Sequence, residues 1–218
     1  MGVFLCISGI AQANRADVEK ALMDFVDENS GTMSQIMESD VIDEDELMIL
    51  HESEKGHITI MYPTTVSWDE ASEFLSAKLN KPVFSLHVHD SDFWMYILYV
   101  NGKEVDRFHP YPEYYQEDSE EELIACAGNA EIVCRHWPNL RPEQISNYLV
   151  RWYSGEDEDY DEPEEVPVKA YPDDEFFIRD DWQIADFMRK VGLDFFETEE
   201  GSPEKTRYHF RIPWRTWN

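Results

Sequence analysis

Basic residues are scarce in this chain of 218 residues. Lysine and arginine together number 18, against 47 aspartates and glutamates, which gives a formal net charge of −29 at pH 7. A surface of that sign repels nucleic acid and anionic membranes, and it attracts cations and basic proteins. The composition therefore argues against direct nucleic-acid or membrane-surface binding and favours a basic protein as the partner.

Cysteine is also rare, and no long hydrophobic run is present. The three cysteines, Cys6, Cys126 and Cys134, show no CxxC or zinc-finger spacing, so we expect free, mostly buried thiols in a reducing compartment. No apolar segment approaches the roughly 20 residues that a transmembrane helix needs. The segment 1–10 lacks a basic region and is typical of a first strand, not of a signal peptide. These features predict a cytoplasmic protein.

The stretch 83–108 carries the clearest structural signal. Two long β-prone runs flank residues 90–92, and the second run ends at Asn101-Gly102. This dipeptide favours a type I′ hairpin turn, because both residues adopt positive φ at low cost. Residues 93–99 are almost wholly apolar or aromatic and do not alternate with polar residues. Such a strand is usually covered on both faces, so we place it centrally in its sheet.

Upstream of this stretch, the patterns predict the order strand, helix, strand, strand, helix, strand. Asn14 is expected to cap the first helix, and Ser67 with Glu70 forms a capping box for the second. The strands are expected at 4–9, 47–51, 57–62 and from residue 83 onward. We therefore expect an α+β fold with an antiparallel or mixed sheet. A ferredoxin-like β-α-β-β-α-β order, extended by the hairpin, is one form of such a fold.

The C-terminal half shows a cluster of short helical patterns. Ser119 and Asn129 each precede one, Pro142 begins another, and residues 180–183 open a fourth. Short strands are expected at 166–171 and 207–212. We divide the chain into an α+β sheet domain at 1–112 and a mostly helical portion at 113–218, packed on the first as one globule.

The most acidic segment is 154–165, where eight of the twelve residues are aspartate or glutamate. Like charges at this density resist compaction, so we expect a solvated loop. Aromatic residues beside it could anchor a partner. The predicted partner-binding residues are Trp152, Tyr153, Glu156, Asp157, Glu158, Asp159, Tyr160 and Asp161. A smaller acidic cluster lies at 40–46.

Two histidines on one predicted strand form a candidate metal site. His87 and His89 are two residues apart, so both side chains point to one face, with Asp90 beside them. Imidazole and carboxylate groups on a shared face could hold a transition metal. A third ligand could come from His51, His57 or His109. The alternative interpretation is a polar strand face without metal.

Signatures of known enzyme classes do not occur in the sequence. It contains no G-x-S-x-G, P-loop, GxGxxG or H-E-x-x-H pattern, so we expect no cofactor. The leading hypothesis is a non-enzymatic binding protein that engages a basic protein, for instance an immunity-type inhibitor of a cationic toxin. A DNA mimic that blocks a DNA-binding protein is one alternative, and a metal-dependent enzyme that uses His87 and His89 is another.

Overall fold

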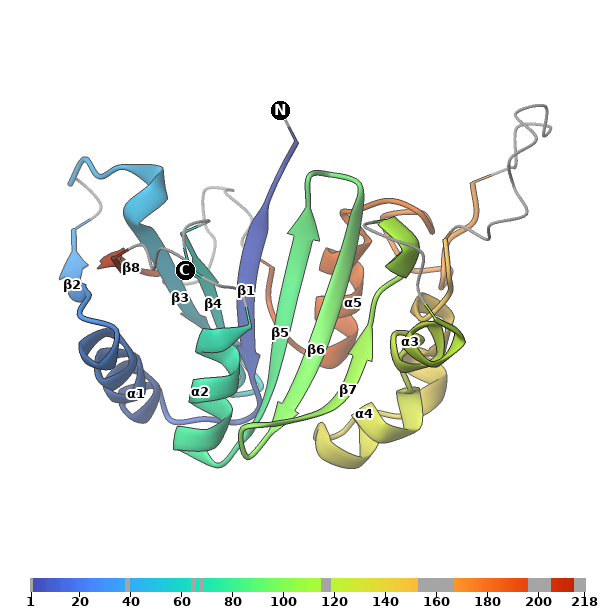
Figure 1. Cartoon of the computed structure of the whole chain (residues 1–218), viewed down its shortest axis with the longest axis horizontal. Helices are drawn as coiled ribbons and strands as arrows, with labels where there is room; N and C mark the ends of the chain where they lie inside the picture. Colours follow the sequence, from blue (N-terminus) through green and yellow to red (C-terminus); the bar gives the residue numbers. More distant parts are fainter. Residues whose placement is uncertain are drawn as a thin grey trace.

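A long antiparallel sheet runs through the molecule, with helices on both of its faces (Figure 1). The computed structural model of this protein describes residues 2–37, 40–63, 66, 69–114, 119–152, 167–195 and 205–213. Within these residues the sheet has eight strands: β1 (Leu5–Ile10), β2 (Thr32–Ile36), β3 (Leu47–Glu52), β4 (Ile58–Tyr62), β5 (Pro82–His89), β6 (Phe93–Val100), β7 (Lys103–Phe108) and β8 (Thr206–Arg211).

Five α-helices and four short 3-10 turns accompany the sheet in the described residues. The helices are α1 (Arg15–Glu28), α2 (Glu70–Leu79), α3 (Glu120–Ala125), α4 (Ala130–His136) and α5 (Gln183–Val191). The turns are η1 (Glu44–Glu46), η2 (Pro112–Tyr114), η3 (Pro142–Gln144) and η4 (Ser146–Tyr148). The α+β prediction is thereby confirmed.

The strand order in the sheet is β2-β8-β3-β4-β1-β5-β6-β7. Strand β4 lies between β1 and β3 and is antiparallel to both, while α1 follows β1 and α2 follows β4. This interleaving of β3, β4, β1 and β5 is the ferredoxin-like order expected from the sequence. The β6–β7 hairpin extends the sheet on one side, and β8 and β2 extend it on the other.

Strand β6 has the environment that its composition predicts. Residues 93–99 are all buried, and Asn101 and Gly102 have φ values of 54° and 70°, as the hairpin turn requires. In the sheet, β6 is the second strand from the β7 edge, so our prediction of a central position was wrong. The prediction that both faces of β6 are covered was right. Glycine and asparagine adopt positive φ angles at a low conformational free-energy cost, so both suit this turn.

Two hydrophobic cores cover the opposite faces of the sheet. On one face lie α1 and α2 (Figure 1), with α2 over β1, β5 and β6; this core also contains residues of β3, β4 and β8, and its buried helix side chains include Leu22, Phe25 and Leu75. On the other face, α5 and the segment around α4, η3 and η4 pack over β5 and β6. Because β8 lies between β2 and β3, the C-terminal half supplies a strand of the sheet as well as helices.

Three helix caps match the sequence. The side chains of Asn14 and Asn129 accept hydrogen bonds from the first backbone N–H groups of α1 and α4, and Ser119 forms a capping box with Glu122. The described part of α2 begins at Glu70, and Asp69 before it accepts a hydrogen bond from the Glu70 N–H. Ser67, the first residue of the expected capping box, lies outside the described residues.

Two further expectations about local structure were wrong, and one strand was not predicted. The segment after Pro142 forms the two 3-10 turns η3 and η4 instead of an α-helix. No strand occurs in the described part of 166–171, where the Tyr171 N–H bonds to the Asp174 carboxylate and not to a neighbouring strand. Strand β2 was not anticipated, because this edge strand is mostly exposed and polar and so lacks a hydrophobic signal.

None of the helices in the described ranges is both long enough and apolar enough to span a membrane.

The packing of α5 gives a first prediction. Phe187 is fully buried, and its ring lies 5.1 Å from Trp94, 5.4 Å from Tyr96 and 5.7 Å from Phe84, measured between centroids. Phe187→Ala should lower the free energy of unfolding by about 3–5 kcal/mol, because it leaves a cavity beside these three aromatic rings. Urea denaturation measures this loss.

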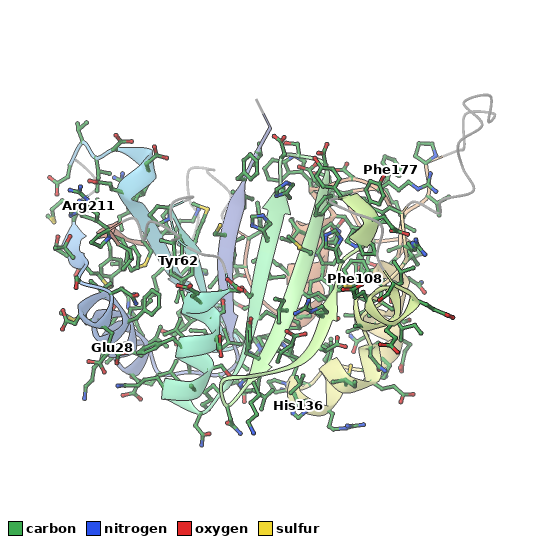
Figure 2. All side chains as sticks on the ribbon, in the orientation of Figure 1. Glu28, Tyr62, Phe108, His136, Phe177 and Arg211 are labelled. Carbon is green, nitrogen blue, oxygen red and sulfur yellow. The ribbon has the colours of Figure 1, made fainter. Side chains whose placement is uncertain are left out.

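The matched control is Phe177→Ala, at a phenylalanine that is 40% exposed and lies at the periphery in Figure 2. This change should cost less than about 1 kcal/mol. Equal losses for the two variants would contradict the proposed core.

Candidate functional site

Most of the predicted partner-binding residues lie outside the described part of the chain. This applies to Tyr153, Glu156, Asp157, Glu158, Asp159, Tyr160 and Asp161. Trp152 is described, and it is only 1% exposed. Its backbone N–H donates to the Pro110 carbonyl at 2.9 Å, and its ring belongs to the core beneath α5. Trp152 therefore holds the fold together in this structure and does not present its ring to a partner.

The residues of the candidate metal site are only partly brought together. His87 and His89 lie on one face of β5, with ring centroids 5.7 Å apart, as their spacing predicts. Asp90 is exposed in the turn that follows, with a positive φ of 49°. His51 and His57 belong to the β3–β4 hairpin. Among the described residues, no three His, Cys, Asp or Glu side chains are grouped as metal ligands.

His109 joins His87 and His89 in an aromatic cluster at one end of β5 and β6. The ring of Phe93 stacks on His89 at 5.3 Å and lies 4.6 Å from His109. Burial, and then the neighbouring His89 imidazole, lower the pKa of both His87 and His109 to about 4. Both rings are therefore neutral at pH 7, which suits a packed cluster better than a charged site.

A thiol–imidazole pair that was not predicted from the sequence lies beside this cluster. Cys6 and His87 are cross-strand partners in β1 and β5, and Cys6 Sγ lies 3.7 Å from His87 Nδ1. Burial, with a smaller effect of the Asp69 carboxylate, raises the pKa of Cys6 to about 12. At neutral pH the thiol keeps its proton, so this pair is not an activated nucleophile. Only the strand register could have revealed it.

An open hollow of about 630 Å³ lies at the β2 end of the sheet. It is lined by β2, by His209 of β8 and by residues 40–46, which we call the β2–β3 acidic loop. In Figure 2, Arg211 marks this end of the molecule, and Phe108 and His136 lie toward the other end. The smaller acidic cluster of the sequence thus borders a surface hollow.

Local hydrogen bonds hold the β2–β3 acidic loop in shape. The Met37 N–H donates to Asp40 Oδ2 at 2.8 Å, and the Asp45 N–H donates to Asp43 Oδ1 at 3.2 Å. The Glu46 N–H donates to the Asp43 carbonyl at 3.0 Å, at the turn of η1. Side-chain oxygens of aspartate often close turns in this way. The positions of the Asp40 and Asp43 carboxylates are therefore set by the loop itself.

In the described part of the hollow, basic side chains lie beside the Glu46 carboxylate and not beside the other carboxylates of the lining. Glu46 Oε2 accepts a hydrogen bond from His209 Nε2 at 2.8 Å, and Arg211 Nε lies 3.6 Å from Glu46 Oε1. Within the described ranges, no basic side chain pairs with Asp40 or Asp43. These two carboxylates remain available to an external cation.

Apolar side chains and a sheet edge adjoin the same hollow. Val41 is fully exposed and Met37 is 72% exposed, while Ile36 and Ile42 are half-buried in its lining. Strand β2 ends the sheet: it pairs with β8 on one side, and no described strand pairs with its other side. An edge of this kind presents backbone N–H and C=O groups to any extended chain that approaches it.

No protein-family model matches this chain, and no curated protein or solved structure shows significant similarity to it. The function is therefore inferred from the residues and contacts described above.

The two neutral histidines predict acid sensitivity. Histidine in an unfolded chain titrates near pH 6.5, whereas His87 and His109 titrate near 4 in the folded protein. The stability that each contributes is complete above about pH 6.5 and is lost as the pH falls toward about 4, because the unfolded chain takes up the protons first. Each histidine should therefore cost about 2–3 kcal/mol of unfolding free energy between pH 7 and about pH 4.5.

Denaturation of the wild type and of His87→Gln at both pH values measures this effect. The variant should lose about 2–3 kcal/mol less than the wild type on acidification. A variant that is as acid-sensitive as the wild type would show that His87 is not held neutral.

The buried thiol gives a third prediction. In a variant with Cys126→Ser and Cys134→Ser, Cys6 is the one remaining thiol. Its labelling by a thiol-specific disulfide reagent at pH 8 should occur only as fast as the protein unfolds, since the thiol is buried and protonated. Rapid labelling of the native protein would instead indicate an accessible thiolate paired with His87.

Proposed function

We propose that this protein binds a basic protein partner, and that the β2–β3 acidic loop together with the edge of β2 forms the contact surface. The observation that carries the proposal is the position of Val41. This apolar side chain is fully exposed between acidic neighbours, beside a hollow and a sheet edge. Exposed apolar side chains that gather beside polar ones are typical of interaction surfaces.

The chemistry of this surface selects a particular kind of partner. A lysine or arginine side chain would find Asp40 and Asp43, and an aliphatic side chain would cover Val41 and Met37. An extended segment could add to β2 through backbone hydrogen bonds, which is a common mode of peptide recognition. The partner we infer therefore presents an extended segment in which basic and apolar residues alternate.

The net charge of −29 supports the same proposal at long range. Opposite charge on a partner accelerates the encounter and disfavours acidic competitors. An immunity-type inhibitor of a cationic toxin, such as a nuclease, is the concrete form of this function that we propose. Such an inhibitor needs no catalytic group, and the neutral Cys6–His87 pair and the ungrouped metal candidates are consistent with a binding role.

The test uses a fluorescent peptide of alternating lysine and valine and the full-length protein. Asp40→Asn with Asp43→Asn removes two charges and keeps oxygen acceptors for the Met37 and Asp45 N–H groups. This double variant should weaken peptide binding by about tenfold, measured by fluorescence anisotropy at low salt. Added salt should weaken wild-type binding as well.

The matched control is Glu120→Gln with Glu121→Gln, two exposed residues of α3. It removes the same charge far from the hollow and should change the dissociation constant less than about twofold. Hydrogen exchange at the amides of β2 should slow when the peptide binds. Equal weakening by both double variants, without protection of β2, would refute the proposed surface.

A further inference from the structure

A cavity of about 320 Å³ lies where turns of the chain from distant parts of the sequence meet. Its volume is at the lower end of the range for small-molecule sites. Gln12 follows β1, Lys55 and His57 belong to the β3–β4 turn, and residues 138–140 follow α4. The C-terminal end of α5 completes the lining with Lys190 and Val191. His57 was a candidate third metal ligand, but among the described residues it is not grouped with His87 and His89, and the proposed partner surface contains none of these lining residues.

The imidazole of His57 is fixed in the wall of this cavity. His57 is 2% exposed, and its ring stacks on Trp137 at 5.3 Å with an interplanar angle of 30°. The Trp137 indole N–H donates to the Val191 carbonyl at 2.7 Å, which ties the stack to α5. His57 Nδ1 accepts the Gln12 backbone N–H at 3.1 Å. The proton of the neutral ring therefore lies on Nε2, which remains as a hydrogen-bond donor.

Lys55 and His57 converge on one point above Gly192. A methyl group built at Gly192 would lie 3.1 Å from Lys55 Nζ and 3.2 Å from His57 Cδ2. Gly192 itself has a φ of 81°, which suits glycine, and the missing side chain lets Lys55 pack closely here, since a methyl group would lie 2.8 Å from Lys55 Cδ. The proximity of the two side chains also explains why the pKa of His57 is lowered, by burial first and then by the Lys55 charge.

The lining of this cavity differs in charge from the rest of the protein. None of its residues is acidic, although acids outnumber bases by 47 to 18 in the whole chain. Lys190 contributes mainly its hydrocarbon chain, because its ammonium bonds to Asp173 at 2.7 Å. Lys55 forms no ion pair with any described residue. Asp194, whose carboxylate acts on the His57 pKa, bonds to His51 Nε2 at 2.8 Å.

From this convergence of donors we propose that the cavity binds a small organic anion. Its carboxylate or phosphoryl group accepts hydrogen bonds from Lys55 Nζ and from His57 Nε2–H. Its apolar body lies against Pro138, Leu140 and Val191, which form the apolar part of the lining. Charge-assisted hydrogen bonds of this kind supply orientation and affinity, and the apolar wall adds contact area.

The test titrates the full-length, isotope-labelled protein with phenyl phosphate, benzoate or inorganic phosphate at constant ionic strength, followed by NMR. Phenyl phosphate or benzoate should cause saturable shifts at the Gln12 and Gly192 amides and at the His57 ring. Lys55→Gln should weaken this binding by about tenfold or more. The tighter of the two aromatic ligands identifies the anionic group that the cavity prefers.

Lys103→Gln is the matched control, since Lys103 is an exposed lysine in the β6–β7 hairpin, away from the cavity. It should leave the dissociation constant unchanged within about twofold. Equal weakening by both variants, or shifts that do not saturate, would overturn the proposal. If inorganic phosphate binds as tightly as phenyl phosphate, the apolar part of the proposed site is wrong.

Discussion

The double-sided burial of β6 is the constraint on which the rest of this structure depends. Residues 93–99 are buried on both faces, so each face needs its own covering layer. Helix α2 covers one face of β6, and α5 with the segment around α4 covers the other. Helix α5 comes from the last part of the chain. Completing the second layer therefore requires the C-terminal half to fold onto the N-terminal half.

The second constraint is the excess of negative charge. Where the fold buries a carboxylate, a basic side chain lies beside it. Asp186 is 1% exposed, accepts the Glu175 and Phe176 N–H groups, and bonds to Arg189 at 2.6 Å. Asp174 is also buried and accepts the Tyr148 hydroxyl at 2.6 Å. A buried carboxylate is tolerable only when hydrogen bonds and opposite charge replace the water that it has lost. Some of the few basic residues therefore pair with buried carboxylates.

The distribution of the remaining charge separates the two proposed sites. The β2–β3 acidic loop keeps Asp40 and Asp43 without a described basic partner, which suits a basic protein. The cavity at His57 has no acidic lining, and the ammonium of Lys55 forms no ion pair with a described carboxylate, which suits an anion. The two proposed sites would attract ligands of opposite charge, and they lie on different elements of the fold. A DNA mimic would carry rows of acidic side chains along a whole face of the protein. This alternative stays a prediction.

Sequence patterns alone determined the local structure wherever the deciding interaction is close along the chain. The Asn101-Gly102 turn, the caps at Asn14, Ser119 and Asn129, and the apolar run of β6 follow from nearby residues. The ferredoxin-like order followed from the sequence of strands and helices. The capping box predicted at Ser67 stays a prediction, because Ser67 lies outside the described residues.

Only the tertiary structure decided which distant residues meet. The Cys6–His87 pair depends on the register between β1 and β5, and the insertion of β8 beside β2 joins strands about 170 residues apart. The cavity at His57 arises from turns that are remote in sequence, and Trp152 proved to be core although its acidic surroundings suggested a surface anchor. The physical reason is that capping and turn formation act over a few residues, whereas strand register and burial are set by the whole sheet and the layers that cover it.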